Sequence, residues 1–278
     1  MAEADGPREV RGRTPAGQGA PRRIVSLVPS WTELVCWLGR AERLVGVTEY
    51  CVHPPEARER CVCIGGTKTP SIDRIRALSP DLVIANREEN RKLDVERLLR
   101  AGVPVLVTEA RSVRDAMHEI EQLGGLLERE QAARALTAEI AAELAAPRPQ
   151  VDPVCVVALI WKAPYMAVGG DCFAHDLLVQ CGARNPFASE RRRYPAIAID
   201  ALVAAQPEVI LLPSEPYAFG ADDREELLAL DTPASRHGRV ALIEGELLSW
   251  YGPRIPRALR ELRQLLGSPS LSEGRSSR

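Results

Sequence analysis

The chain of 278 residues has few aromatic side chains and no long apolar segment. Its aromatic residues are four Trp, five Tyr and three Phe, so the core must consist mainly of Val, Leu, Ile and Ala. No apolar run reaches the roughly 20 residues that a membrane-spanning helix needs, and we therefore expect a protein that does not cross a bilayer. A net charge of −2 gives no basis for binding nucleic acid or an anionic membrane surface.

The common sequence signatures of catalysis are also missing. The chain contains no GxGxxG dinucleotide fingerprint, no GxSxG nucleophile elbow and no HExxH zinc motif. The stretch Gly65-Gly66-Thr67-Lys68-Thr69 is rich in glycine but lacks the spacing of a phosphate-binding loop. We therefore expect a protein that is not an enzyme and has no catalytic cofactor.

The N-terminal residues and the cysteines predict a cytoplasmic location. Met1 to Pro21 is rich in Gly, Pro, Arg and Glu and has no apolar core of the kind found in secretory signals. The seven cysteines are odd in number and scattered, which favours a reducing compartment. The alternative is a periplasmic protein whose start site is misassigned. Residues 1–21 and 268–278 are predicted to be disordered tails.

Between these tails, apolar β-branched runs alternate with helical patterns. The predicted strands are residues 23–28, 44–47, 82–85 and 103–107 in the first half, and 154–161, 209–212 and 240–243 in the second. Ser112 to Ala146 is rich in helix formers and is interrupted at Gly124-Gly125, which predicts two consecutive helices.

This order of elements predicts an α/β fold with two lobes. Each lobe is expected to contain a mainly parallel sheet flanked by helices, and a backbone helix is expected to join them. The predicted boundaries are 22–111 for the N-terminal lobe, 112–148 for the linking helices and 149–267 for the C-terminal lobe.

A repeated segment also predicts two similar lobes. Ile72–Ile84 aligns with Ile199–Leu211 without a gap, at a spacing of 127 residues. Each copy is predicted to be a short helix starting at an Ile-Asp pair, a turn with Pro followed by an acid, and a buried strand. The spacing is too long for a solenoid repeat, which recurs at about 20–50 residues. We therefore expect two lobes with a cleft between them.

Most aromatic residues lie at or just beyond the ends of predicted strands, where ligands bind in parallel α/β sheets. Flat rings at such positions suit a broad planar ligand, although amphipathic rings also occur at loop edges without binding anything. These residues are Trp31, Tyr50, Trp161, Tyr165, Tyr194, Tyr217, Phe219, Trp250 and Tyr251. Glu88 and Asn90 also follow a strand end and are candidates for polar contacts with a ligand, with a helix N-cap as the alternative for Asn90.

One segment contains four potential metal ligands within thirteen residues, namely Cys51, His53, Cys61 and Cys63. Their spacing differs from that of common zinc sites, and buried thiols with a loop-capping histidine are the alternative. Cys51 and His53 are the candidate metal ligands. His175 lies among apolar residues of a predicted helix, and we interpret it as structural.

Several short motifs occur in a fixed order over residues 22–267. They are Arg23–Ser30, Thr32-Glu33-Leu34, Val45-Gly46-Val47, His53–Glu56, Val62–Gly66, Leu78–Ile84, Gly169-Gly170, His175–Leu178, Tyr194-Pro195 and Leu248-Ser249-Trp250. In this order and spacing they resemble the helical-backbone (class III) substrate-binding proteins of ABC importers for cobalamin, haem and ferric siderophores. The cobalamin-binding branch is the most similar.

The resemblance implies a fold, a ligand and a partner. The fold has two α/β lobes on a backbone helix, and the ligand, a corrinoid of the cobalamin type or a related metal chelate, binds in the cleft. The rings that face the ligand fall on Trp161, Tyr194 and Trp250, with Tyr50 nearby. The resemblance also implies a monomer that docks on an ABC permease if it is exported.

One acid per lobe contacts the permease in that family, and these acids fall on Asp73 and Asp200. A role for each in stabilising its helix N-terminus is compatible with docking. Two alternatives remain open at this point. The same fold can bind haem or a ferric siderophore, or the chain can be a cytoplasmic enzyme or metal chaperone of tetrapyrrole metabolism that uses Cys51, His53, Cys61 and Cys63.

Overall fold

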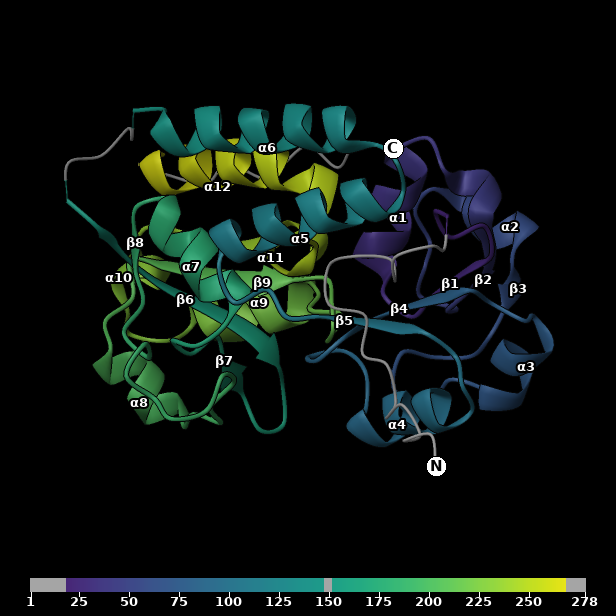
Figure 1. The fold of residues 1–278 in the computed structure, drawn as a ribbon. Coiled ribbons are helices and arrows are strands. Elements are labelled where there is room, and N and C mark those ends of the chain that lie inside the picture. Colours follow the sequence, from purple (N-terminus) through teal and green to yellow (C-terminus); the bar gives the residue numbers. More distant parts are fainter. Residues whose placement is uncertain (1–18, 148–151, 269–278) are drawn as a thin grey trace. The chain divides into compact units, whose positions relative to one another are not determined.

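The computed structural model describes residues 19–147 and 152–268, which form two compact α/β units (Figure 1). Unit 1 comprises the described residues up to Ala110 together with Arg114–Glu139 and Tyr251–Pro253. Unit 2 comprises Arg111–Val113, Ile140–Trp250 and the residues from Arg254 onward. The predicted two-lobed α/β fold is confirmed, whereas most of both predicted tails lies outside the described residues.

Unit 1 contains a parallel sheet of five strands in the order β3-β2-β1-β4-β5. The strands are β1 (Ile24–Ser26), β2 (Leu44–Val47), β3 (Val62–Cys63), β4 (Leu82–Asn86) and β5 (Val105–Thr108). Its helices include α1 (Pro29–Trp37), α2 (Pro55–Arg60), α3 (Ile72–Ala77) and α4 (Lys92–Arg100), with a 3₁₀ turn at Ala41–Arg43. Every residue of β1 and β4 is buried, as expected for central strands that are covered on both faces.

Unit 2 contains a second sheet in the order β10-β9-β6-β7, with β8 also pairing with β6. The strands are β6 (Val154–Trp161), β7 (Met166–Ala167), β8 (Ala183–Arg184), β9 (Val209–Pro213) and β10 (Val240–Ile243). Strand β7 pairs with β6 in the antiparallel sense. The helices include α7 (Phe173–Gln180), α8 (Ile199–Ala204), α9 (Ala221–Leu228), α10 (Pro233–Arg236), α11 (Glu246–Ser249) and α12 (Ile255–Gly267), with a 3₁₀ turn at Gly252–Arg254.

Two consecutive helices, α5 (Val113–Leu126) and α6 (Glu130–Ala145), follow β5, as the run of helix formers predicted. The joint lies at residues 127–129, where Glu128 has a φ of 57°. A Cβ atom at Gly124 would lie 2.3 Å from the Cβ of Ala133, so glycine allows the two helices to approach closely there. Helix α6 passes from unit 1 to unit 2 after Glu139, and within unit 2 Arg260 of α12 pairs with Glu143 at 2.6 Å.

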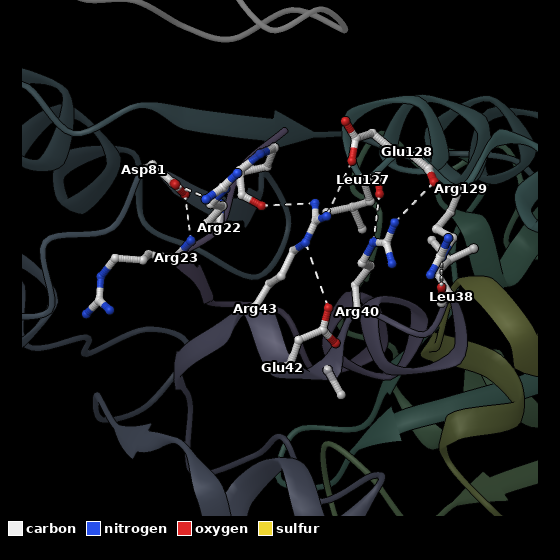
Figure 2. A network of polar contacts seen from close by, with 12 residues as sticks. Arg22, Arg23, Leu38, Arg40, Glu42, Arg43, Asp81, Leu127, Glu128 and Arg129 are labelled. Carbon is white, nitrogen blue, oxygen red and sulfur yellow. Dashed lines mark hydrogen bonds and ion pairs between the residues drawn. The ribbon is translucent and has the colours of Figure 1, made fainter. Parts of the chain in front are cut away.

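Arginines connect the end of α1 to the joint between α5 and α6 (Figure 2). Arg40 Nε donates to the carbonyl of Leu127 at 2.9 Å, and Arg129 Nε donates to the carbonyl of Leu38 at 3.0 Å. The last carbonyls of a helix have no partner within the helix, so these guanidinium groups satisfy acceptors that would otherwise need water. The two contacts are reciprocal. Arg40 follows α1 and binds the end of α5, and Arg129 follows α5 and binds the end of α1.

The two copies of the sequence repeat adopt the same structure at the same spacing. Helices α3 and α8 both start at the Ile of an Ile-Asp pair, and β4 and β9 occupy equivalent residues. Ser79 and Gln206, which are equivalent, both have a φ of 46°. Such left-handed backbone is uncommon outside glycine, so its recurrence shows that the two turns have one geometry.

The acid that follows the Pro in each copy fastens a neighbouring strand. The carboxylate of Asp81 accepts the backbone N–H groups of Arg22 at 2.7 Å and Arg23 at 2.9 Å, just before β1 (Figure 2). The equivalent Glu208 accepts the N–H of Cys155 in β6 at 2.7 Å. The acid at this position of the repeat therefore has the same structural role in both units.

Replacing Glu208 with alanine should lower the free energy of unfolding by about 1–3 kcal/mol, because the buried N–H of Cys155 loses its acceptor. Urea denaturation followed by circular dichroism measures the change. Asp200→Ala is the matched control, since Asp200 is an exposed acid in the same repeat and its removal should change stability by less than about 1 kcal/mol. Equal effects of the two substitutions would contradict the role given to Glu208.

Candidate functional site

Four of the residues predicted to contact a ligand are accessible and lie at, beyond or beside strands. Tyr50 follows β2 and is 57% exposed, and Trp161 ends β6 and is 42% exposed. Glu88 follows β4 and is partly exposed, as is Tyr194. The backbone on either side of Tyr194 is fixed next to β7, because Ala167 donates to the carbonyl of Pro195 at 3.0 Å and Gly169 donates to that of Arg193 at 2.7 Å.

In unit 1, the glycine-rich loop after β3 lies beside Tyr50 and Glu88. A Cβ atom at Gly66 would lie 3.3 Å from Cε2 of Tyr50, so the missing side chain leaves room for the ring. Lys68 of the same loop donates through Nζ to the carbonyl of Glu88 at 2.5 Å. Burial lowers the pKa of Lys68, while Glu89 and Glu88 oppose that change. The loop thus brings a cation and an aromatic ring to the same end of the sheet.

In unit 2, Trp161 belongs to a row of three aromatic rings. Its ring meets the edge of Tyr217 at 5.7 Å with an interplanar angle of 68°, and Tyr217 meets Phe219 at 4.7 Å and 61°. Phe219 is buried in the core, so the row extends from the surface inward. Edge-to-face contacts of this kind are favourable and fix ring orientation. The sequence analysis included Tyr217 among the aromatic residues at strand ends, but nothing in the sequence indicated that it contacts Trp161.

A charged network supports the turn between β6 and β7. Lys162 Nζ binds Asp223 Oδ1 at 2.6 Å and Glu226 Oε2 at 2.7 Å, and the Tyr165 hydroxyl donates to Glu226 Oε1 at 2.7 Å. The bonds from Lys162 lower the pKa values of Asp223 and Glu226, and these partners raise the pKa of Lys162. Burial, followed by the bond to Glu226, raises the pKa of Tyr165 to about 12. All three ionic groups therefore remain charged near neutral pH.

Tyr165 itself is a correction to the predicted site. Its ring is buried in the core of unit 2 and its hydroxyl is used by Glu226, so it cannot offer a surface to a ligand. The partners of this network lie 61 and 64 residues from Lys162, and no local motif indicated them.

Trp250 is also less accessible than predicted, with 6% of its surface exposed. Its Nε1 donates to Glu215 Oε1 at 2.8 Å, and the guanidinium of Arg254 lies 4.8 Å from the ring centre. Ser249 Oγ donates to the same oxygen of Glu215 at 2.7 Å. The indole is therefore held from its N–H edge and covered on a face, which is a supporting position within unit 2.

Trp31 is the clearest correction, because it has no exposed surface. It lies in the first turn of α1 rather than in a loop. Its Nε1 donates to Thr108 Oγ1 at 2.9 Å, and its ring stacks on Tyr251 at 5.2 Å with an interplanar angle of 25°. The predicted ligand contact is wrong for Trp31, which is a core residue of unit 1.

Asn90 is neither the N-cap of α4 nor a ligand-facing amide. The N-cap residue is Arg91, and the Asn90 side chain is buried. Its Oδ1 accepts the N–H of Asn86 at 2.7 Å, while its Nδ2 donates to the carbonyls of Leu27 at 3.2 Å and Thr67 at 3.0 Å. The amide hydrogens thus connect the end of β1 with the glycine-rich loop, and the amide oxygen binds the end of β4.

Asp73 and Asp200 lie exposed in the first turns of α3 and α8, one in each unit. Acids at these positions favour the helix N-terminus, and Ser71 adds a side-chain cap to α3. Their predicted contact with a permease stays a prediction.

Cys51, one of the two predicted metal ligands, is engaged in other contacts, and the two residues together are too few for a metal site. Cys51 Sγ lies 3.1 Å from Thr32 Oγ1 and 3.2 Å from Thr48 Oγ1, and burial raises the pKa of its thiol. A neutral thiol is a poor metal ligand. Among the described residues, no group of three or more His, Cys, Asp and Glu side chains is arranged to hold a metal ion. Binding of a metal by Cys51 and His53 stays a prediction with no third ligand to support it.

His175 agrees with its structural interpretation. Its Nδ1 lies 3.2 Å from Nδ2 of Asn185, and burial lowers its pKa, so the neutral ring is favoured. Asn185 in turn donates to the carbonyl of Val168 at 2.9 Å, which ties the helix to the segment after β7.

Comparison with known proteins identifies the class to which this fold belongs. The haem-binding periplasmic protein RhuT from Roseiflexus sp. RS-1 aligns with a TM-score of 0.78 and 26% identity, over 90% of this chain and 99% of that one. The periplasmic vitamin B12-binding protein BtuF of Vibrio cholerae aligns with a TM-score of 0.77 and 25% identity, over 90% and 98%. Both are two-lobed α/β binding proteins, and this chain has the same fold.

The sequence gives the family directly. The family model described as periplasmic binding protein matches residues 24–247, and the chain belongs to this family. The vitamin B12-binding protein of Vibrio campbellii is 27% identical over 249 residues, which are 88% of this chain and 89% of that one. The resemblance stated from the motifs is confirmed. Proteins of this family are the substrate-binding components of ABC importers and take small-molecule ligands. In the described part of the chain, no helix combines the length and apolarity needed to span a bilayer.

The predicted cytoplasmic location is wrong, because the family and both solved relatives are periplasmic. The cysteines misled the prediction for a physical reason. All seven are free thiols, and five of them are buried and hence shielded from solvent. Burial also raises the pKa values of Cys51, Cys61 and Cys155, which suppresses the reactive thiolate. Free cysteines in buried positions therefore indicate how the core is packed and do not indicate the cellular compartment of the protein.

Proposed function

We propose that the protein is a non-catalytic binding protein of an ABC importer and that it takes up a corrinoid of the cobalamin type. The observation that carries the proposal is Trp161, an exposed ring at the carboxyl end of β6 that Tyr217 holds edge-on. A large flat ring in a fixed orientation suits a broad planar ligand better than an ion or a sugar. The vitamin B12-binding relatives support the same ligand class.

The ligand-contacting residues in this proposal are Tyr50 and Glu88 of unit 1 and Trp161 and Tyr194 of unit 2. All four retain accessible surface beyond or beside strand ends. The rings supply apolar contact with the macrocycle, and the Glu88 carboxylate accepts hydrogen bonds from amide groups on its periphery. The ligand is released unchanged, and none of these residues acts as a catalytic group.

Haem is the second candidate ligand, and one observation favours it. Tyr50 is 57% exposed, and a phenolate oxygen is one of the axial ligands that proteins supply to haem iron. The haem-binding relative RhuT supports this candidate. A corrinoid would bind with no change at Tyr50 beyond packing, whereas haem would place its iron on the phenolic oxygen.

We also propose that Asp73 and Asp200 dock the protein, as a monomer, on its membrane permease. Each is an exposed carboxylate in the first turn of a helix, and the repeat places one in each unit. Carboxylates pair well with arginine, and such pairs at the rim of an interface set orientation and association rate more than affinity.

Titration of the purified protein with cyanocobalamin, dicyanocobinamide, haem and a ferric siderophore tests the proposal. Absorbance reports binding, and the melting temperature reports stabilisation, which reaches about 2.7 kcal/mol at a ligand concentration of 100 Kd. We expect both corrinoids to bind and to raise the melting temperature. Binding of haem alone, with a spectrum that changes in Tyr50→Phe, would select the second candidate. No response to any tetrapyrrole would refute both.

A further inference from the structure

The segment that follows β9 contacts both tryptophans at the end of the unit 2 sheet. Glu215 accepts the indole N–H of Trp250 at 2.8 Å. Two residues later, the ring of Tyr217 packs edge-on against Trp161 at 5.7 Å. The two tryptophans are 89 residues apart in the sequence, and this short segment is a common support for both.

The segment is itself firmly held at both of its ends. Ser214 donates its N–H to the carbonyl of Ile243 at 3.0 Å, and its hydroxyl accepts the N–H of Gly245 at 2.9 Å. A Cβ atom at Gly245 would lie 2.2 Å from Cγ of Glu215, so this close approach requires glycine. At the other end, Phe219 is buried in the core and contacts the ring of Tyr217. Because residues 214–219 are held at both ends, they can restrict the orientation of the Trp250 and Trp161 rings that they contact.

We propose that Glu215 and Tyr217 are positioning residues that set the orientation of Trp250 and Trp161 together. Glu215 acts through the indole N–H of Trp250, and Tyr217 acts through its edge-to-face contact with the Trp161 ring. Neither residue needs to touch the ligand. The effect on affinity rests on the proposed function, because it assumes that Trp161 contacts the bound chelate, whereas the effect on ring mobility does not.

The expected size follows from the entropy of ordering one side chain. Trp161 is 42% exposed, so without Tyr217 its ring would sample several rotamers and would have to be ordered when the ligand binds. Ordering one such side chain weakens binding by about three- to tenfold. Trp250 is covered by Arg254 as well, so loss of Glu215 should act mainly on the mobility of the indole.

Acrylamide quenching of tryptophan fluorescence tests the positioning without any ligand. The chain has four tryptophans, and only Trp37 and Trp161 are substantially exposed, at 46% and 42%. In a Trp37→Phe background, quenching therefore reports Trp161. We expect Tyr217→Leu to increase quenching and Tyr217→Phe to leave it unchanged, because phenylalanine keeps the ring edge. Glu215→Ala should expose Trp250 as a second quenchable fluorophore, and Glu215→Gln, which keeps an acceptor oxygen, should not.

Affinity for cyanocobalamin supplies the second measurement on the same variants. Tyr217→Leu should bind about three- to tenfold more weakly, and Tyr217→Phe should bind as the parent does. Weaker binding of Tyr217→Leu with unchanged quenching would overturn the proposal, since it would mean that Tyr217 contacts the ligand directly. Unchanged quenching and unchanged affinity would also overturn it. If the parent protein binds no tetrapyrrole, the proposed function fails, but the quenching result still decides the positioning roles.

A pH titration gives a further readout for Glu215 that does not depend on an unstable variant. Burial raises the pKa of Glu215, Glu246 of α11 raises it further, and Ser249, Trp250 and Arg254 oppose the rise. Protonation makes the carboxyl a weaker acceptor for the indole N–H. The emission of Trp250 should therefore shift in weak acid, at a pH above the usual pKa of glutamate, and Glu215→Gln should lack this transition. The same transition in Glu215→Gln would assign it to another group and overturn the role of Glu215.

Discussion

Replacement of Trp31 by alanine is expected to lower the free energy of unfolding by about 3–5 kcal/mol, the range for deleting a fully buried large aromatic side chain. Trp31 has no exposed surface, and its ring stacks on Tyr251 at 5.2 Å. Its N–H also donates to Thr108 Oγ1, which in turn donates to the carbonyl of Ala85 at 3.0 Å. The substitution therefore leaves a cavity and removes one member of a buried polar chain.

Trp37→Ala is the matched control, because Trp37 lies on the same helix and is 46% exposed. Its loss should change stability by less than about 1 kcal/mol. Urea denaturation followed by far-ultraviolet circular dichroism suits both variants, since it does not depend on the deleted fluorophores. If Trp31→Ala were as stable as Trp37→Ala but lost affinity for cyanocobalamin, Trp31 would be a ligand contact after all, and its assignment to the core would be wrong.

The long elements of the fold could be predicted because their patterns are local. Strand β6 was predicted at residues 154–161 and β2 at residues 44–47, and both have those bounds. Both are continuous apolar runs, as expected for strands covered on both faces. The prediction missed β3, β8, α2, α10 and α11, which contain between two and six residues. Elements this short show no periodicity, and β3 and β8 exist because β2 and β6 offer an edge to pair with.

The accessible rings could be predicted from their place at strand ends, but the orientation of each ring could not. The rule that ligands bind beyond strand ends led correctly to accessible rings at Tyr50 and Trp161. The same rule also selected Trp31 and Tyr165, whose rings point into the protein. Their orientation depends on Thr108 and Glu226, which lie 77 and 61 residues away and carry no recognisable motif. Burial of an amphipathic ring is decided by whether a distant polar partner satisfies its N–H or O–H.

The sequence repeat combines two roles that the pattern alone could not separate. The acid after each proline fastens a strand, through Asp81 to Arg22 and Arg23 and through Glu208 to Cys155. The acid in the first turn of each helix, Asp73 or Asp200, remains exposed. The acid after the proline of each copy is bound to a strand, whereas Asp73 and Asp200 favour their helix N-termini and stay accessible for the proposed docking role.

Replacement of Trp161 by alanine should weaken binding of cyanocobalamin by roughly tenfold to a hundredfold while leaving stability nearly unchanged. An aromatic side chain contributes about 150–250 Å² of surface, and Trp161 has 42% of its own still exposed for a ligand to cover. Burial of this area alone, at about 25 cal/mol per Å², gives about 1.5–3 kcal/mol of lost affinity. Isothermal titration calorimetry measures the change in Kd.

The contrast between the two tryptophans makes this prediction specific. Trp161→Ala should change affinity by much more than stability, and Trp31→Ala should change stability by much more than the affinity of the molecules that remain folded. Trp161→Phe should recover part of the affinity, because phenylalanine retains a flat ring that Tyr217 can contact. If Trp161→Ala bound cyanocobalamin as tightly as the parent protein, the exposed ring would have no part in recognition. The ligand contact of unit 2 would then be assigned to Tyr194, the other residue of unit 2 in the proposed contact set.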